Sequence, residues 1–149
     1  MDESDSTLKG AVVINYTNKS PDTLNYLWLQ LDQNLFDTGS RGAATTIPTG
    51  GRFDAKGYTK GGYRIQSASV VYKGKIFTIM PVITDTRMQL RLPFSMKPNG
   101  DKIGININYS FSIPQYGADR MGRLQTRNGV IYQLAQWYPR MCVYDDVEG

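Results

Sequence analysis

The chain contains no histidine among its 149 residues and a single cysteine, Cys142. Histidine is the commonest general base and the commonest metal ligand, so its absence argues against a self-sufficient hydrolase. One cysteine excludes an internal disulfide framework. No apolar run approaches the roughly 20 residues that a membrane-spanning helix requires. We therefore expect no cofactor, no metal and no membrane span in this chain.

The charge balance is weakly basic, with a net charge of +4. The basic residues are spread from Lys9 to Arg140 without a dense block. Nucleic-acid-binding proteins usually cluster such residues in a patch, so we expect no nucleic-acid partner. A hydrophobic content of 40% beside 20% charged residues is typical of a folded globular protein. At this length the chain can bury a sizeable core, and we expect residues 1–149 to form a single domain.

The clearest structural signal is the stretch Ile103–Ile113, in which apolar and small polar residues alternate without a break. A period of two sends the two sets to opposite faces of a strand. The apolar set is Ile103, Ile105, Ile107, Tyr109, Phe111 and Ile113, and the small polar set is Gly104, Asn106, Asn108, Ser110 and Ser112. A strand this long with one wet face belongs to a large antiparallel sheet.

Further strands are expected along the chain. They are Leu8–Thr17, Leu24–Leu31, a hairpin of Tyr63–Lys73 with Lys75–Ile83, Met88–Leu92, and Val130–Gln136. Within Leu24–Leu31 both faces are largely apolar, which predicts a strand in the middle of the domain. Pro81 indicates an edge or a bulge, and the Met88–Leu92 strand is expected to end before Pro93. With seven to nine strands and no convincing helix, the sequence predicts an all-β fold, an antiparallel β-sandwich.

Two stretches are expected to be irregular. Asp37–Gly62 is rich in Gly, Thr, Ser and Pro and is too long for an ordinary connection, so we expect either a mobile loop or a loop that becomes ordered against a partner. Gln115–Asn128 carries three arginines whose spacing fits one helical face, but its glycines weaken a helix prediction. We interpret this second stretch as a solvated loop, with an anion site as the alternative.

The carboxy-terminal run Trp137–Tyr144 is aromatic and only partly polar, which is unusual for a solvated tail. It is interpreted as a surface that packs against a missing partner. At the other end, Met1 is followed directly by the polar residues 2–5. Together these features predict a fragment of a longer polypeptide.

Three segments carry a resemblance to a known family. They are Tyr16–Leu24 (YTNKSPDTL), Leu27–Asn34 (LWLQLDQN) and Gln133–Arg140 (QLAQWYPR). In their order and spacing they resemble the amino-terminal domain of aminopeptidase N-like zinc metallopeptidases (gluzincins), especially a bacterial branch. The resemblance covers most of the chain. It implies a saddle-like β-sandwich truncated before a thermolysin-like catalytic domain.

The resemblance also implies a role for this domain. In the family it packs on the catalytic domain and forms one wall of the peptide-substrate cleft. The zinc and its His-Glu-x-x-His motif belong to the catalytic domain. The resemblance therefore implies that this fragment is inactive by itself and that the full-length parent is a zinc aminopeptidase. Family members of this branch are commonly exported, which is expected of the parent, while the fragment leaves localisation open.

Candidate site residues follow from the third segment. In the family, a Gln or Glu near the end of the domain receives the free amino group of the peptide substrate. Gln133 matches a recurrent Gln, and the amine-binding position itself matches Ala135, so Gln136 fills the role only with a one-residue shift. Gln136 ranks above Gln133 as the substrate ligand, with ordinary hydrogen bonding at a strand edge as the alternative for both. Trp137, Tyr138 and Arg140 are expected at the cleft or the domain interface, with Arg140 bonding a carboxylate such as Asp145 or Asp146.

Two other classes of function remain open. An independent β-sandwich module that binds peptide or carbohydrate is compatible with the ten tyrosines. A stand-alone enzyme is the weaker alternative, because the sequence offers no coherent arrangement of a nucleophile and a base. The carboxy-terminal run discriminates between the first two classes, because a truncated domain is expected to expose residues 137–143 as an apolar patch.

Overall fold

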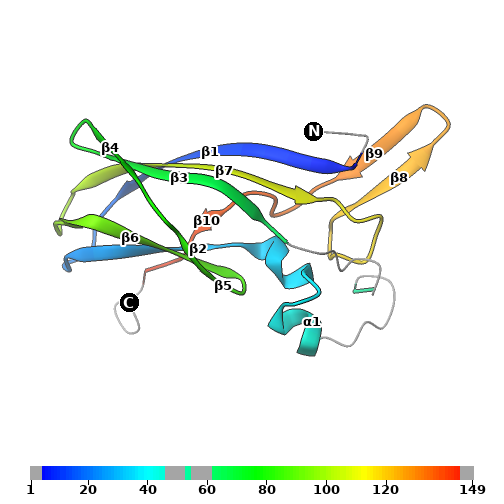
Figure 1. Ribbon diagram of the computed structural model, residues 1–149, viewed down its shortest axis with the longest axis horizontal. Helices are drawn as coiled ribbons and strands as arrows, with labels where there is room; N and C mark the ends of the chain where they lie inside the picture. Colours follow the sequence, from blue (N-terminus) through cyan, green and yellow to red (C-terminus); the bar gives the residue numbers. More distant parts are fainter. Residues whose placement is uncertain (1–4, 46–52, 55–61, 145–149) are drawn as a thin grey trace.

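Two four-stranded antiparallel sheets make up most of the structure (Figure 1). The computed structural model describes residues 5–45, 53–54 and 62–144. Sheet A has the strand order β1 (Thr7–Thr17), β7 (Lys102–Ser112), β3 (Arg64–Tyr72), β4 (Lys75–Thr78). Sheet B has the order β10 (Arg140–Met141), β2 (Leu24–Gln30), β6 (Arg87–Met96), β5 (Val82–Thr84). The remaining elements are the hairpin β8 (Gly122–Thr126) and β9 (Gly129–Gln133), the 3₁₀ helix η1 (Asp32–Phe36) and the short helix α1 (Arg41–Thr45).

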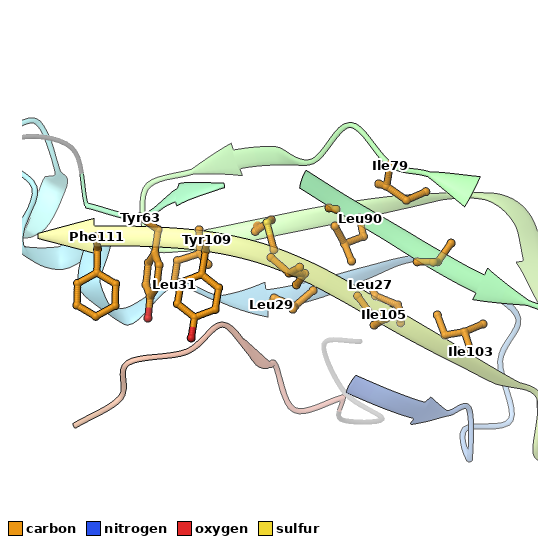
Figure 2. Close-up of a cluster of buried hydrophobic side chains, with 14 of the residues drawn as sticks. Leu27, Leu29, Leu31, Tyr63, Ile79, Leu90, Ile103, Ile105, Tyr109 and Phe111 are labelled. Atoms are coloured by element: carbon orange, nitrogen blue, oxygen red, sulfur yellow. The ribbon is translucent and has the colours of Figure 1, made fainter. Parts of the chain in front are cut away.

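The core lies between the two sheets, as the sandwich prediction requires. Figure 2 shows Leu27, Leu29 and Leu31 approaching the apolar side chains of β7. All six apolar residues predicted for the inner face of Ile103–Ile113 are buried, from Ile103 to Ile113. The all-β antiparallel prediction is therefore confirmed.

The strand β7 is the central element of sheet A. It pairs along its length with β1, in the register Thr7↔Ser112 to Thr17↔Lys102. On its other side it pairs with β3. Its outer side chains are small and polar, and Ser110 departs from the prediction because it is buried beneath Gln66, whose Nε2 donates to its Oγ at 2.7 Å.

The chain passes from one sheet to the other between β4 and β5. β4 is the edge strand of sheet A, and β5 is the edge strand of sheet B. The predicted hairpin arm Lys75–Ile83 is therefore wrong as one strand: only Lys75–Thr78 pairs with β3, Pro81 lies in the crossing, and Val82 begins a strand of the other sheet. In Figure 1 the crossing runs diagonally over the side of the two sheets.

Several predicted bounds of strands and loops differ from the structure. β6 runs through Pro93, because the pairing with β2 is irregular between Leu24 and Tyr26 and requires no amide donor from the proline. Residues 115–128, interpreted from the sequence as a solvated loop, contain the strand β8. Its residues show no clear alternation, and they form a strand through pairing with β9. The sequence shows no convincing helix because η1 and α1 have only five residues each, which is too few to give a helical period.

The strand expected over Val130–Gln136 ends earlier, at Gln133, as β9. The backbone then turns, and Gln136 has a positive φ of 55°. Most of the Asp37–Gly62 stretch lies outside the described residues, as do Asp145 and Asp146. Within the described part of the chain, no helix is long and apolar enough to cross a membrane.

Candidate functional site

Three consecutive side chains of η1 bind segments that are distant in the sequence. Asp32 accepts two hydrogen bonds from the Arg140 guanidinium, from Nε to Oδ2 at 2.9 Å and from Nη2 to Oδ1 at 3.1 Å. This bidentate geometry is the strongest arrangement for an arginine and a carboxylate. The sequence expectation that Arg140 binds a carboxylate is met by Asp32, while the two examples named from the sequence, Asp145 and Asp146, lie outside the described residues. The hydrogen bond with Asp32 raises the pKa of Arg140.

The second side chain, Gln33, binds the backbone that follows β9. Its Nε2 donates to the carbonyl oxygen of Gln136 at 3.1 Å and lies 3.4 Å from that of Ala135. Tyr63 approaches the same Gln136 carbonyl, with its hydroxyl donating at 3.3 Å. Gln33 and Tyr63 are both buried. The main chain at Gln136 is therefore held by two buried donors.

The third side chain, Asn34, joins two more segments. Its Oδ1 accepts from the Tyr63 amide at 2.7 Å, and its Nδ2 donates to the carbonyl of Asp85 at 2.8 Å. The Tyr63 ring is fixed in turn by edge contacts with Tyr109 and Phe111, with ring centroids 5.6 and 5.2 Å apart. Burial raises the pKa of the Tyr63 hydroxyl, which keeps it protonated as a donor. Asp32, Gln33 and Asn34 thus form an anchor, here called the η1 anchor.

The residues held by the η1 anchor present aromatic side chains at the surface. Trp137 and Tyr138 are 40% and 45% exposed, and their rings make an edge contact at 5.4 Å. Pro139 between them and Arg140 is fully buried. Farther along, Val143 is 87% exposed. The Gln136 side chain is also exposed.

Gln133 lies in a different place from Gln136. It ends β9, pairs with Gly122, and lines a pocket of about 370 Å³ beside the β8–β9 hairpin. Tyr116, Asp119, Arg120 and Leu124 are among the other lining residues. Gln136 lies outside this pocket. The structure therefore separates the two glutamines that the sequence offers as alternatives.

A second pocket, of about 310 Å³, lies between β2 and the residues after β10. Tyr26, Trp28, Met141 and Cys142 are among the residues that line it. The Cys142 amide donates to the Trp28 carbonyl at 2.9 Å, which continues the β10 pairing by one residue. Burial raises the pKa of the Cys142 thiol, so the thiolate is disfavoured.

Sequence reasoning identified Gln136, Trp137, Tyr138 and Arg140 but missed the residues that hold them. Gln33 and Tyr63 carry no local signal, because their partner is 103 and 73 residues away in the chain. The one available signal is the polar triplet Asp32-Gln33-Asn34 directly after an apolar strand, where three adjacent amide or carboxylate side chains are unusual. Among the described residues, no three Cys, Asp or Glu side chains are grouped so that they can hold a metal ion.

A scan of protein-family models and a search of curated proteins found no match to this chain. The family resemblance therefore rests on the three sequence segments themselves, and any function drawn from it is a proposal.

Proposed function

We propose that this chain is the non-catalytic amino-terminal domain of a zinc metallo-aminopeptidase. In this proposal it packs on a downstream catalytic domain and forms one wall of the peptide-substrate cleft. The zinc and the hydrolytic groups belong to that catalytic domain. This chain contributes an anchored segment, residues 135–140, to the cleft and to the domain interface.

One observation carries the proposal. Two of the segments that resemble the family are far apart in the sequence, yet their residues meet at the η1 anchor, through Asp32 with Arg140 and Gln33 with Gln136. Contacts of this kind between two distant motifs are expected where the motifs together position a surface of fixed shape. That surface is aromatic and exposed at Trp137 and Tyr138. Exposed aromatic groups beside an arginine are typical of interface hot spots and favour a docked domain over an independent module.

Within this proposal we favour Gln136 over Gln133 as the ligand of the substrate amino group. An ammonium group needs an acceptor whose position is fixed and whose surroundings are not cationic. Gln136 has a fixed backbone, and the arginine nearest to it in the sequence, Arg140, is paired with Asp32. Gln133 shares its pocket with Arg120 and Arg123, against one carboxylate, Asp119.

The test uses the natural full-length polypeptide that contains this chain. Its zinc content and its hydrolysis of amino-acid arylamides are measured side by side. We expect about one zinc per chain and arylamide hydrolysis, because the family motif requires both. A full-length polypeptide that binds no zinc and cleaves no arylamide overturns the proposal.

The amine contact is tested by two variants of the same polypeptide. Gln136→Gly removes the side chain but suits a backbone with positive φ, so the anchored conformation is retained. We expect it to raise KM about tenfold, equivalent to about 1.4 kcal/mol of binding, with unchanged zinc content. Gln125→Ala, on the exposed part of β8, is the matched control and should leave KM unchanged. If Gln133→Ala raises KM and Gln136→Gly does not, Gln133 is the ligand instead.

A further inference from the structure

The two sandwich sheets end in four edge strands of unequal length. The edges β4, β10 and β5 have four, two and three residues, whereas the remaining edge, β1, has 11. Proteins usually shorten an edge strand, interrupt it with proline or a bulge, or cover it, because its unpaired backbone invites another strand. β1 has neither a proline nor a break in its register with β7. In Figure 1 it runs along the margin of the molecule.

Two backbone hydrogen bonds at the ends of β1 show which of its residues face away from β7. The Ile113 amide donates to the Ser6 carbonyl, and the Asn18 amide donates to the Asp101 carbonyl, both at 2.9 Å. Because the backbone groups of successive residues point alternately to the two sides of a strand, the even-numbered residues of β1 bond β7. The odd-numbered residues therefore direct their amides and carbonyls to the open side. Among the described residues, these groups find no backbone partner at Ala11, Val13 and Asn15.

The core-facing side chains of β1 are less completely covered than those of its neighbour. Four apolar side chains of the strand are only partly buried: Leu8, Val12, Ile14 and Tyr16. The residues opposite them on β7 are all buried: Phe111, Ile107, Ile105 and Ile103. The open side of β1 thus combines unpaired backbone groups with half-exposed apolar side chains. An added strand with an apolar inner face would satisfy both.

The sequence of β1 fits its own edge in the antiparallel direction. Its middle residue is Val12, so a two-fold axis there pairs the whole strand with itself, with Thr7 opposite Thr17. This register sets Val12 opposite Val12 and Ala11 opposite Val13, with core-facing side chains beside core-facing ones and outward ones beside outward ones. The open amides and carbonyls of the two strands then meet as hydrogen-bonded pairs.

Charge does not oppose this pairing. Lys9 is the one charged residue of β1, and in this register it lies opposite Asn15. The two copies of Lys9 are then six positions apart along the paired strands, or about 20 Å. That separation exceeds the Debye length of about 8 Å at physiological ionic strength. β1 therefore lacks the like-charge contact that would keep two copies apart.

We propose that two copies of this chain pair through β1, in the antiparallel direction about a two-fold axis at Val12, so that their A sheets join into one continuous sheet. The interface is isologous, because each copy contributes the same strand, and neither copy keeps an open edge at β1. The edges left on the joined sheet are the two four-residue β4 strands, which limits growth beyond a dimer. The pairing involves β1 alone and does not require the downstream domain of the proposed function.

Sedimentation equilibrium of the natural full-length polypeptide measures its mass over a range of concentrations, and we expect the wild-type chain to dimerise. Ala11→Lys/Val13→Lys changes two exposed, outward side chains and places lysines opposite each other on both sides of the axis. We expect it to weaken dimerisation at least about tenfold. The matched control, Ser67→Lys/Ser69→Lys, makes the same charge change on β3, an inner strand of the same sheet, and should leave the dimer unchanged.

A cysteine at position 12 tests the register. At a directly opposed pair that exchanges no hydrogen bonds, the two Cα atoms are about 4.5 Å apart, which a disulfide can bridge. We expect mild oxidation to link Val12→Cys to its own copy, identified by mass spectrometry as a peptide joined to itself at residue 12. Asn15→Cys is the matched control. It is the more exposed position, but in this register it lies about 20 Å from its own copy and should not cross-link.

A monomeric wild-type polypeptide at every concentration overturns the proposal, as does a dimer that both lysine variants leave intact. A dimer in which Asn15→Cys cross-links and Val12→Cys does not also overturns it, because β1 then pairs in another register or lies outside the interface. Zinc content and arylamide hydrolysis are read on the same samples. They report on the proposed function alone, so the dimer and the proposed function can fail separately.

Discussion

Gln33 donates its side-chain amide to the main-chain carbonyl of Gln136, 103 residues farther along the chain. The bond joins the 3₁₀ helix after β2 to the turn after β9. Because Asp32 and Arg140 make a second connection between the same two regions, the turn at Gln136 is fixed at both ends. This arrangement explains how a residue outside any strand can present a defined surface.

Replacement of Gln33 by Ala should destabilise the chain. The Gln136 carbonyl loses its shorter bond, and a buried space is left near Tyr63, so we expect the free energy of unfolding to fall by about 1–2 kcal/mol. Gln33→Glu retains the size, but a carboxylate cannot donate, so its loss should be at least as large. Urea denaturation measures both. Gln125→Ala, on the hairpin surface, should change stability by less than about 0.5 kcal/mol. A Gln33→Ala variant as stable as this control contradicts the anchor.

Gln136 has a positive φ of 55°, so substitutions there can test the backbone conformation apart from the function of the side chain. Any residue with a Cβ is strained there, so Gln136→Gly should keep or raise stability by up to about 1 kcal/mol. Gln136→Val should lower it, since β-branched residues tolerate this region least. Thermal unfolding of the two variants distinguishes them. A Gly variant that is less stable than the Val variant contradicts the backbone conformation.

Asn18 is fully buried and connects two turns at one end of the sandwich. Its Nδ2 donates to the carbonyls of Asp22 and Lys97 at 2.8 and 3.0 Å, and its Oδ1 accepts from Ser20. Asn18→Ala removes bonds to several part-buried groups at once, so we expect a loss of about 2 kcal/mol. Asn108→Ala is the matched control, because Asn108 is exposed and has a single side-chain bond to Ser67. Urea midpoints that are equal for the two variants refute this role for Asn18.

The strands with regular alternation were predictable from the sequence because burial on one face imposes a period of two. Leu27, Leu29 and the six apolar residues of β7 follow this rule and are buried. The strand β8 was not predictable, because its Leu124 pairs with Ile131 of β9 at the surface rather than in the core. The η1 anchor was also out of reach, since contacts such as Gln33 with Gln136 depend on the tertiary fold. The candidate residues Gln136 to Arg140 came from the family resemblance rather than from periodicity.

Gly10 makes room for the Tyr109 ring on the neighbouring strand. A Cβ at Gly10 would lie 2.6 Å from Cζ and the hydroxyl oxygen of Tyr109, a distance that real side chains do not tolerate. Gly10→Ala should therefore displace the ring and cost about 1–3 kcal/mol. Gly104→Ala is the control in the same sheet, because its Cβ would meet its neighbours only at 3.7 Å and beyond. Denaturation of the two variants should rank Gly104→Ala as the more stable, and the reverse order would exclude the steric explanation.

The burial of Tyr109 predicts that the free energy of unfolding falls at alkaline pH. Its hydroxyl is buried without a hydrogen-bond partner among the described residues, and burial raises its pKa to about 12. An unfolded chain releases this proton near pH 10, whereas the folded chain retains it. Because the unfolded state then binds fewer protons, the free energy of unfolding falls as the pH rises from about 10 towards 12. Tyr109→Phe removes this contribution, and because it also removes an unpaired buried hydroxyl, it should be as stable as the wild type or slightly more stable at pH 7. Urea denaturation at pH 7, 10 and 11 measures both effects, and an identical alkaline loss in the two chains would show that Tyr109 does not cause it.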